Sequence, residues 1–203
     1  MRKVSFFLML MLTSVAGNIA AKGIPSEIFK NGKVQYDKST NTLTLEDGFA
    51  YSLSKGLVVF NTGKDLRIVL KGNAEFKAAL VFEDNVIIEA EQPATLSITS
   101  NISGSAIKCP TLTVNEKVHL QLLSRNSQDG MYALDCGTLS IHHASFTAET
   151  TTASLGVKVQ EMQLEGVVME KPKGGAVNEQ VGGICFGDGL AAKIVRIRPE
   201  VKK

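Results

Sequence analysis

Carboxylate, amide and imidazole side chains recur at two adjacent positions of a repeated segment, and they are the groups of this chain best suited to chemistry. The set is Glu89, Asn115, Glu116, His142, His143 and Glu165. A carboxylate beside an imidazole can bind a divalent cation or transfer a proton. The same side chains can also form ordinary pairs on the solvated face of a sheet. We therefore predict a candidate ligand-binding patch here, and we assign no catalytic residue, metal site or cofactor.

The cysteines are a second candidate for chemistry. Cys109 and Cys136 are 27 residues apart, and Leu112 and Leu139 share this offset. If the segments stack, the two cysteines lie about 4.8 Å apart, within the range of a disulfide. Parallel neighbours in register point in the same direction, however, and buried cysteine also packs well as a thiol. The pair is a disulfide candidate with a reduced stack as the favoured alternative, and Cys185 is expected to be unpaired.

Short repeated strands must position both sets of residues. Most members of one series alternate apolar, polar and apolar residues, and the members start 20 to 27 residues apart: Leu43–Leu45, Leu66–Ile68, Val86–Ile88, Leu112–Val114, Leu139–Ile141 and Met162–Leu164. This period of two is typical of a strand with one buried face. A second series precedes the first by five residues, at Val81, Ile107, Leu134 and Val157, and a third series follows it. Three strands per repeat predict one coil of a parallel β-helix.

The predicted fold is all-β: a single-stranded, right-handed parallel β-helix, or solenoid, of about six to seven coils. The right hand follows from the general preference of parallel crossovers. We expect one domain over residues 22–203, with an N-terminal cap over 22–32, coils over 33–198 and a tail over 199–203. A leucine-rich repeat would need a fixed Asn or Cys position and a helical return, which the sequence lacks. A β-sandwich would not need the five-residue offset between strand series.

The first 21 residues have the composition of a secretory signal. Arg2 and Lys3 precede an apolar run from Val4 to Val15, which is too short to span a bilayer, and small residues end the segment at Ala21. We expect export to the periplasm or the exterior, with no membrane insertion after cleavage. Without Arg2 and Lys3 the 22 basic residues become 20, against 20 acidic residues. This balance favours no nucleic-acid partner.

The opening coils carry a resemblance. Val34–Asp37 followed by Asn41–Asp47, and later Gly56–Val58 and Leu66–Asn73, resemble the opener and second coil of small secreted β-helix proteins common in Bacteroidota. Members are often called hypothetical or carbohydrate-binding-domain proteins. The resemblance covers residues 33 to 165, and its motifs are structural. It implies the fold and the export, and it implies no catalytic residue.

For function, the sequence favours a secreted, non-enzymatic protein that interacts with glycans or surfaces. The expected partner is an extracellular polysaccharide or a cell-surface component. One alternative is a polysaccharide lyase or hydrolase on a pectin-lyase-like scaffold, which needs several carboxylates in a groove made by long loops. The coils here are short, and no Asp-x-Asp cluster occurs. A structural or adhesive module is the other alternative. Sugar-binding surfaces usually present aromatic rings, but Trp is absent here and the only tyrosines are Tyr36, Tyr51 and Tyr132.

Overall fold

The computed structural model describes residues 23–101, 104–125, 132–151 and 155–201. The predicted signal segment, residues 1–21, lies outside these ranges. Strands make up most of the described chain, and the one helical element is a short 3-10 helix, η1 (Ser26–Asn31). No helix within the described ranges is long and apolar enough to cross a membrane.

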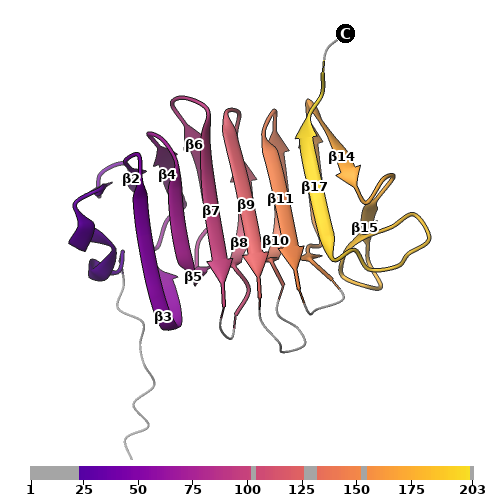
Figure 1. Ribbon diagram of the computed structural model, residues 1–203, viewed down its shortest axis with the longest axis horizontal. Coiled ribbons are helices and arrows are strands. Elements are labelled where there is room, and N and C mark those ends of the chain that lie inside the picture. The colour runs from indigo at the N-terminus through magenta and orange to yellow at the C-terminus, as the bar shows by residue number, and fades with distance from the viewer. Residues whose placement is uncertain (1–22, 102–103, 126–131, 152–154, 202–203) are drawn as a thin grey trace, which may run out of the picture.

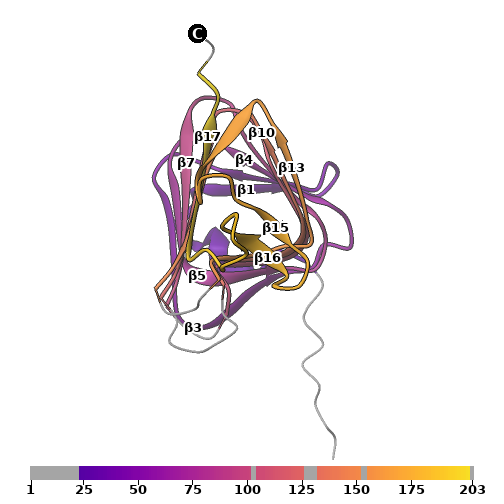
Figure 2. The ribbon, with the colours of Figure 1, turned by 90° about the vertical axis from the view of Figure 1, so that its right-hand side faces the viewer.

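The chain winds into a parallel β-solenoid of about five coils, which confirms the predicted fold class with slightly fewer coils than expected. Figure 1 shows the coils side by side from the N-terminal to the C-terminal end, and Figure 2, which looks along the stack, shows a three-sided outline. Each coil contributes one strand to each side. We name the sides face A, face B and face C, in the order in which a coil visits them.

The strand bounds follow this order. Face A consists of β2 (Thr42–Leu45), β4 (Leu66–Leu70), β6 (Val86–Ala90), the second halves of β8 (Ile107–Val114) and β10 (Leu134–His142), and β13 (Glu161–Glu165). Face B consists of the first halves of β3 (Phe49–Phe60) and β5 (Ala74–Phe82), then β7 (Ala94–Ser100), β9 (Val118–Ser124) and β11 (Ser145–Thr150). Face C consists of the second halves of β3 and β5, the first halves of β8 and β10, and β12 (Val157–Lys158).

The register on face A is the one that the repeat predicts, except between the first two strands, β2 and β4. Val86 pairs with Leu112, and Leu112 pairs with Leu139. Between β2 and β4, Leu43 pairs with Ile68 and not with Leu66, a shift of two residues. A shift of two leaves the same side chains on the inner side, because the side-chain period of a strand is also two.

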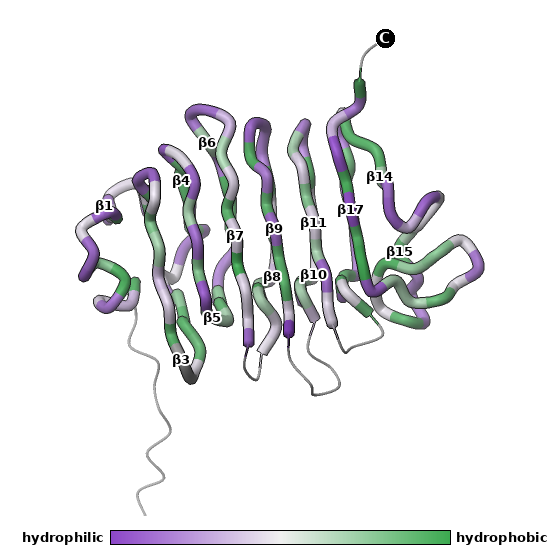
Figure 3. Tube along the Cα trace, viewed as in Figure 1, coloured by the Kyte–Doolittle hydropathy of each residue, from purple (hydrophilic) through white to green (hydrophobic). Residues whose placement is uncertain are grey.

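Inward side chains fill the solenoid with aliphatic and aromatic groups. Figure 3 shows the resulting alternation of hydrophobic and hydrophilic residues along the strands of face B. The Phe60 and Phe82 rings stack with centroids 4.6 Å apart, and the Phe49 and Phe76 rings lie 5.0 Å apart. Burial of each such side chain contributes about 1.5–3 kcal/mol. The coils are therefore held by contacts with the coils directly above and below.

The N-terminal end of the stack is closed by η1 and by β1 (Val34–Asp37). Ile28 of η1 is fully buried against the core. β1 pairs with β2 in the antiparallel direction. Residues 22–32 were predicted as this cap, and η1 lies within them.

The C-terminal end departs from the prediction. After β13 come β14 (Val167–Lys171), β15 (Ala176–Asn178), β16 (Gly183–Cys185) and β17 (Ile194–Pro199). β17 lies between β11 and β14 and pairs antiparallel with both, and β16 pairs antiparallel with β12 and β15. In Figure 2, β15 and β16 lie across the end of the stack. The expectation that coils continue to residue 198 is therefore wrong, because antiparallel strands joined by short turns end the parallel stack after β13.

Candidate functional site

The predicted polar residues lie along the outer side of face A. His142 pairs directly with Glu165 across β10 and β13. The pairs Ile88–Val114 and Val114–Ile141 bring the next residues of each strand, Glu89, Asn115 and His142, side by side. We call Glu89, Asn115, Glu116, His142, His143 and Glu165 the face A patch.

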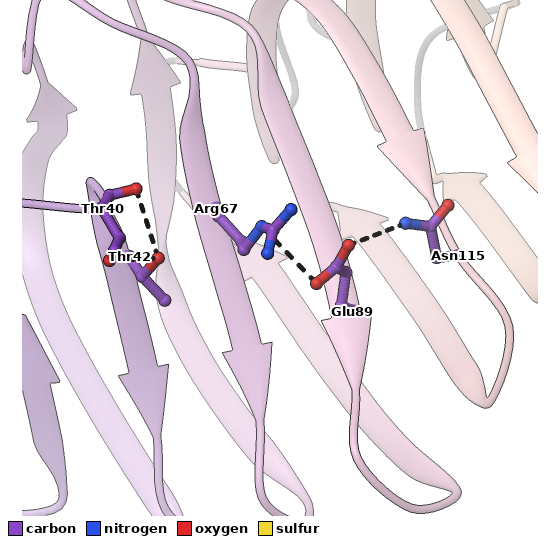
Figure 4. A network of polar contacts seen from close by, with 5 residues as sticks. All are labelled: Thr40, Thr42, Arg67, Glu89 and Asn115. Atoms are coloured by element: carbon purple, nitrogen blue, oxygen red, sulfur yellow. Dashed lines mark hydrogen bonds and ion pairs between the residues drawn. The ribbon is translucent and has the colours of Figure 1, made fainter. Parts of the chain in front are cut away.

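One half of the face A patch is organised around Glu89. Asn115 donates a hydrogen bond from Nδ2 to Glu89 Oε1 at 3.1 Å, and Arg67 Nε lies 3.6 Å from Glu89 Oε2 (Figure 4). The sequence reasoning did not include Arg67. It could have been found, because Arg67 stands two residues before Val69, which pairs with Glu89, and thus on the same outward side of β4. Figure 4 also shows the Thr40–Thr42 hydroxyl contact, farther along this side of the molecule.

The other half is organised around Glu165. His142 donates from Nδ1 to Glu165 Oε2 at 2.8 Å, and His143 Nε2 lies 3.9 Å from Oε1. The hydrogen bond from His142 lowers the pKa of the Glu165 carboxyl below its usual range. His143 adopts a left-handed backbone with φ of 51°, and its ring lies against Gly166.

The two halves border one shallow hollow of about 310 Å³, lined by Glu89, Ala90, Asn115, Glu116, His142 and His143. Glu116 is exposed on its rim. Across the described ranges, no three His, Cys, Asp or Glu side chains converge in a way that could hold a metal ion. The geometry of the patch is that of hydrogen-bonded pairs between neighbouring coils on a solvated sheet face.

A longer depression follows the corner between faces A and B. It consists of a hollow of about 430 Å³ at the first three coils and one of about 330 Å³ that continues from the second coil to Pro199 of β17. The two hollows share Asn73 and Thr95, and the second shares His143 with the face A patch. We call this depression the corner groove. Its polar lining includes Asn73, Thr95, Lys117, His119, His143 and Ser145.

Contacts between coils hold the polar groups of the corner groove in place. The Thr95 backbone N–H donates to Asn73 Oδ1 at 2.9 Å, and Lys117 Nζ donates to the Glu91 carbonyl at 3.4 Å. Partial burial lowers the pKa of His119, which favours its neutral imidazole. His119 Nε2 lies 3.4 Å from Gln121 Nε2 on the outer side of β9. The sequence reasoning did not predict this groove, because it forms where strand ends meet turn residues such as Asn73, Pro93 and Lys117, and the strand pattern does not specify the turns.

Cys109 and Cys136 are register partners in β8 and β10, and both are buried free thiols. The neighbouring Cys136 and burial raise the pKa of the Cys109 thiol well above its usual range, so the protonated thiol is favoured. The pair lines a hollow of about 590 Å³ beside the Lys158–Asp135 ion pair, whose Nζ and Oδ1 atoms are 3.3 Å apart. Cys185 is a buried free thiol in β16.

These hollows and pairs are the features from which a function must be argued. No family model, no curated protein and no solved structure matches this chain.

Proposed function

We propose that this protein is a secreted, non-enzymatic β-solenoid that binds an extended glycan along the corner groove. The observation that carries the proposal is the continuity of the groove: its two hollows join at Asn73 and Thr95 and run past all five coils. Successive coils of a parallel stack rise by about 4.8 Å. This rise is close to the length of one sugar ring in an extended polysaccharide, so each coil can contact one ring.

The lining of the groove suits sugar hydroxyls. Amide, hydroxyl and imidazole groups from Asn73, Thr95, Ser145 and His119 both donate and accept hydrogen bonds. Pro93 adds apolar surface against which the C–H groups of a sugar ring can pack. A groove of a few convergent polar groups over a partly apolar floor is the usual form of a ligand site.

Two features favour binding over hydrolysis. Among the described residues that line the corner groove, Glu75 is the one carboxylate, whereas glycoside hydrolysis uses a pair of them. The nearby Glu89 lies beside Arg67 and accepts a hydrogen bond from Asn115. Both oxygens of this carboxylate therefore already have partners on the sheet face, so Glu89 is not a free second carboxylate beside the groove.

The test is titration calorimetry of the protein from residue 22 onward with neutral oligosaccharides of increasing length, chosen from a glycan array. Affinity should rise with each added sugar until the groove is filled. Thr95→Val should weaken binding by roughly two- to tenfold, the value of one neutral hydrogen bond. Thr99→Val is the matched control, because Thr99 lies on the outer side of the same strand and outside the groove lining. Equal effects of the two substitutions, or an affinity independent of length, would contradict the proposal.

A further inference from the structure

The C-terminal cap contains a hollow of about 680 Å³, larger than the hollows described above. It lies between the turn after β14 and the loop that precedes β17, at the yellow end of the molecule in Figure 1. The corner groove meets β17 at Pro199, whereas this hollow meets β17 at Ile194, the opposite end of the strand. We call it the cap hollow, and it is separate from the proposed glycan site.

The floor of the cap hollow is apolar. Pro172, Phe186, Ala191 and Ile194 line it. Phe186 is 48% exposed, so much of this aromatic side chain is in contact with water. A ligand that covers this ring gains the free energy of removing apolar surface from water.

The rim of the cap hollow is cationic. Lys171, Lys173 and Lys193 line it with one carboxylate, Glu170. None of the three lysines forms an ion pair with any residue that the structure describes. In addition, Lys171 pairs directly with Arg196 across β14 and β17. Like charges in opposed positions destabilise a strand pair, and an anion bound there reduces the repulsion.

We propose that the cap hollow is a second ligand site, which takes a small organic anion with an apolar body. The apolar body packs on Phe186 and Ile194, and the anionic group lies among Lys171, Lys173 and Lys193. The volume falls within the range of about 300–1,000 Å³ that is usual for small-molecule sites. Charge on the rim and an exposed aromatic ring on the floor select against neutral sugars and against inorganic anions.

Two fluorescent probes of the same ring system test the site. Anilinonaphthalene sulfonate carries an aromatic body and one negative charge, and phenylnaphthylamine is its neutral counterpart. The sulfonate should bind with a stoichiometry of one and more tightly than the neutral probe. Replacing two rim lysines, Lys173→Gln with Lys193→Gln, should weaken sulfonate binding about tenfold and leave the neutral probe unchanged. The control, Lys38→Gln with Lys64→Gln, removes the same charge from exposed residues near the N-terminal end of the stack. It should change neither affinity.

Substitution of Phe186, on the floor of the cap hollow, distinguishes binding at this site from a general effect of surface charge. Phe186→Leu should retain sulfonate binding, and Phe186→Asp should abolish it. Because Phe186 is half exposed, both variants should melt at the temperature of the wild type. The proposal would be overturned if the two double lysine variants bound the sulfonate with equal affinity, or if Phe186→Asp left sulfonate binding unchanged. It would also be overturned if polyglutamate bound in a way that depends on the rim lysines but not on Phe186. The last result would indicate an acidic polymer as the ligand.

Discussion

Ser124 illustrates how a single side chain limits the stability of the core. It is fully buried in β9, next to Ser100 and Thr150 in the registered strands β7 and β11. Its Oγ has no hydrogen-bond partner among the described residues. Removing a polar atom from water costs free energy, and without a partner no hydrogen bond in the folded state offsets this cost.

Ser124→Ala should therefore stabilise the protein, by about 1 kcal/mol. The measurement is the free energy of unfolding from urea titrations of both proteins. A loss of stability in the variant would mean that the hydroxyl has a partner in solution, and the prediction would then be wrong.

The second residue of interest is Gly166, next to the face A patch. Its φ is 61°, and a Cβ added there would lie 2.0 Å from the His143 ring. Gly166→Ala should destabilise the protein by about 1–3 kcal/mol, since both the backbone conformation and the contact become unfavourable. The double variant Gly166→Ala with His143→Ala should recover only the part of the lost stability that comes from the contact with the His143 ring. If His143→Ala recovers nothing, the contact with the ring is not the cause.

At the scale of the element, the β1–β2 hairpin depends on one carboxylate. Asp37 Oδ1 accepts hydrogen bonds from the N–H and the hydroxyl of Ser39, at 2.8 and 2.6 Å, and Oδ2 accepts one from Thr40 at 2.9 Å. These hydrogen bonds lower the pKa of the Asp37 carboxyl from its ordinary value of 3.8. A carboxyl with a lowered pKa in the folded state stabilises above its unfolded pKa, and this stabilisation is lost as pH falls through the folded pKa.

Asp37→Ala should lower the melting temperature at neutral pH by a small amount, because the group is exposed. The difference from the wild type should narrow once the pH falls below 3.8. Thermal melts across an acid titration measure this difference. A gap that stays constant into strong acid would show that the charge of Asp37 does not support the hairpin.

A whole coil should be removable as a unit. Val86 and Leu112 are register partners, so deletion of residues 86–111 joins Asn85 to Leu112 at the equivalent position. β4 then stacks on the second half of β8, and Leu80 meets Leu134 where it met Ile107. The shortened protein should fold with the same type of circular dichroism spectrum and a lower melting temperature, because one interface is lost. A disordered spectrum would contradict the independence of the coils.

The middle of this fold could be predicted from the sequence because each coil repeats a similar pattern of inward apolar residues. Val86, Leu112 and Leu139 mark one column of that repeat. The C-terminal end could not be predicted in this way. Gly182-Gly183-Ile184 resembles Gly104-Ser105-Ala106-Ile107, the small residues that precede a face C strand, yet β16 is antiparallel to β12. The side-chain period is the same for both strand directions, so the pattern alone cannot distinguish them.

The candidate sites also differ in whether the sequence predicts them. The column from Glu89 to Glu165 could be predicted, because regular strands place equal offsets side by side. The corner groove depends on the shapes of turn side chains such as Asn73, and the repeat does not specify those. The cap hollow brings Lys173 together with Phe186 through the antiparallel end of the chain, which the repeat does not extend to.

At the scale of the whole molecule, the two ends protect the stack. A parallel stack that simply stopped would leave a row of unpaired backbone groups, which is a template for another chain. β1 covers β2, and β17 covers β11.

A truncation that removes residues 183–203 takes away β16 and β17 and exposes the edges of β12 and β11 that they cover. The truncated protein should associate end to end, and its apparent mass should rise with concentration. Light scattering after size-exclusion chromatography measures this. The control lacks residues 201–203 only and should behave as the full chain does. A truncated protein that matches this control at every concentration would show that β17 is not needed as a cover.

Because the ends are built from antiparallel strands and the middle from coils that stack in the same way, neither end fixes how many coils lie between them. A gene can lose or duplicate one coil without any change at the two covers. If the groove binds a glycan, each duplication lengthens the bound polymer by one sugar. The number of coils then sets the length of glycan that is bound. Selectivity for glycan length can therefore evolve by one coil at a time and requires no new side chain.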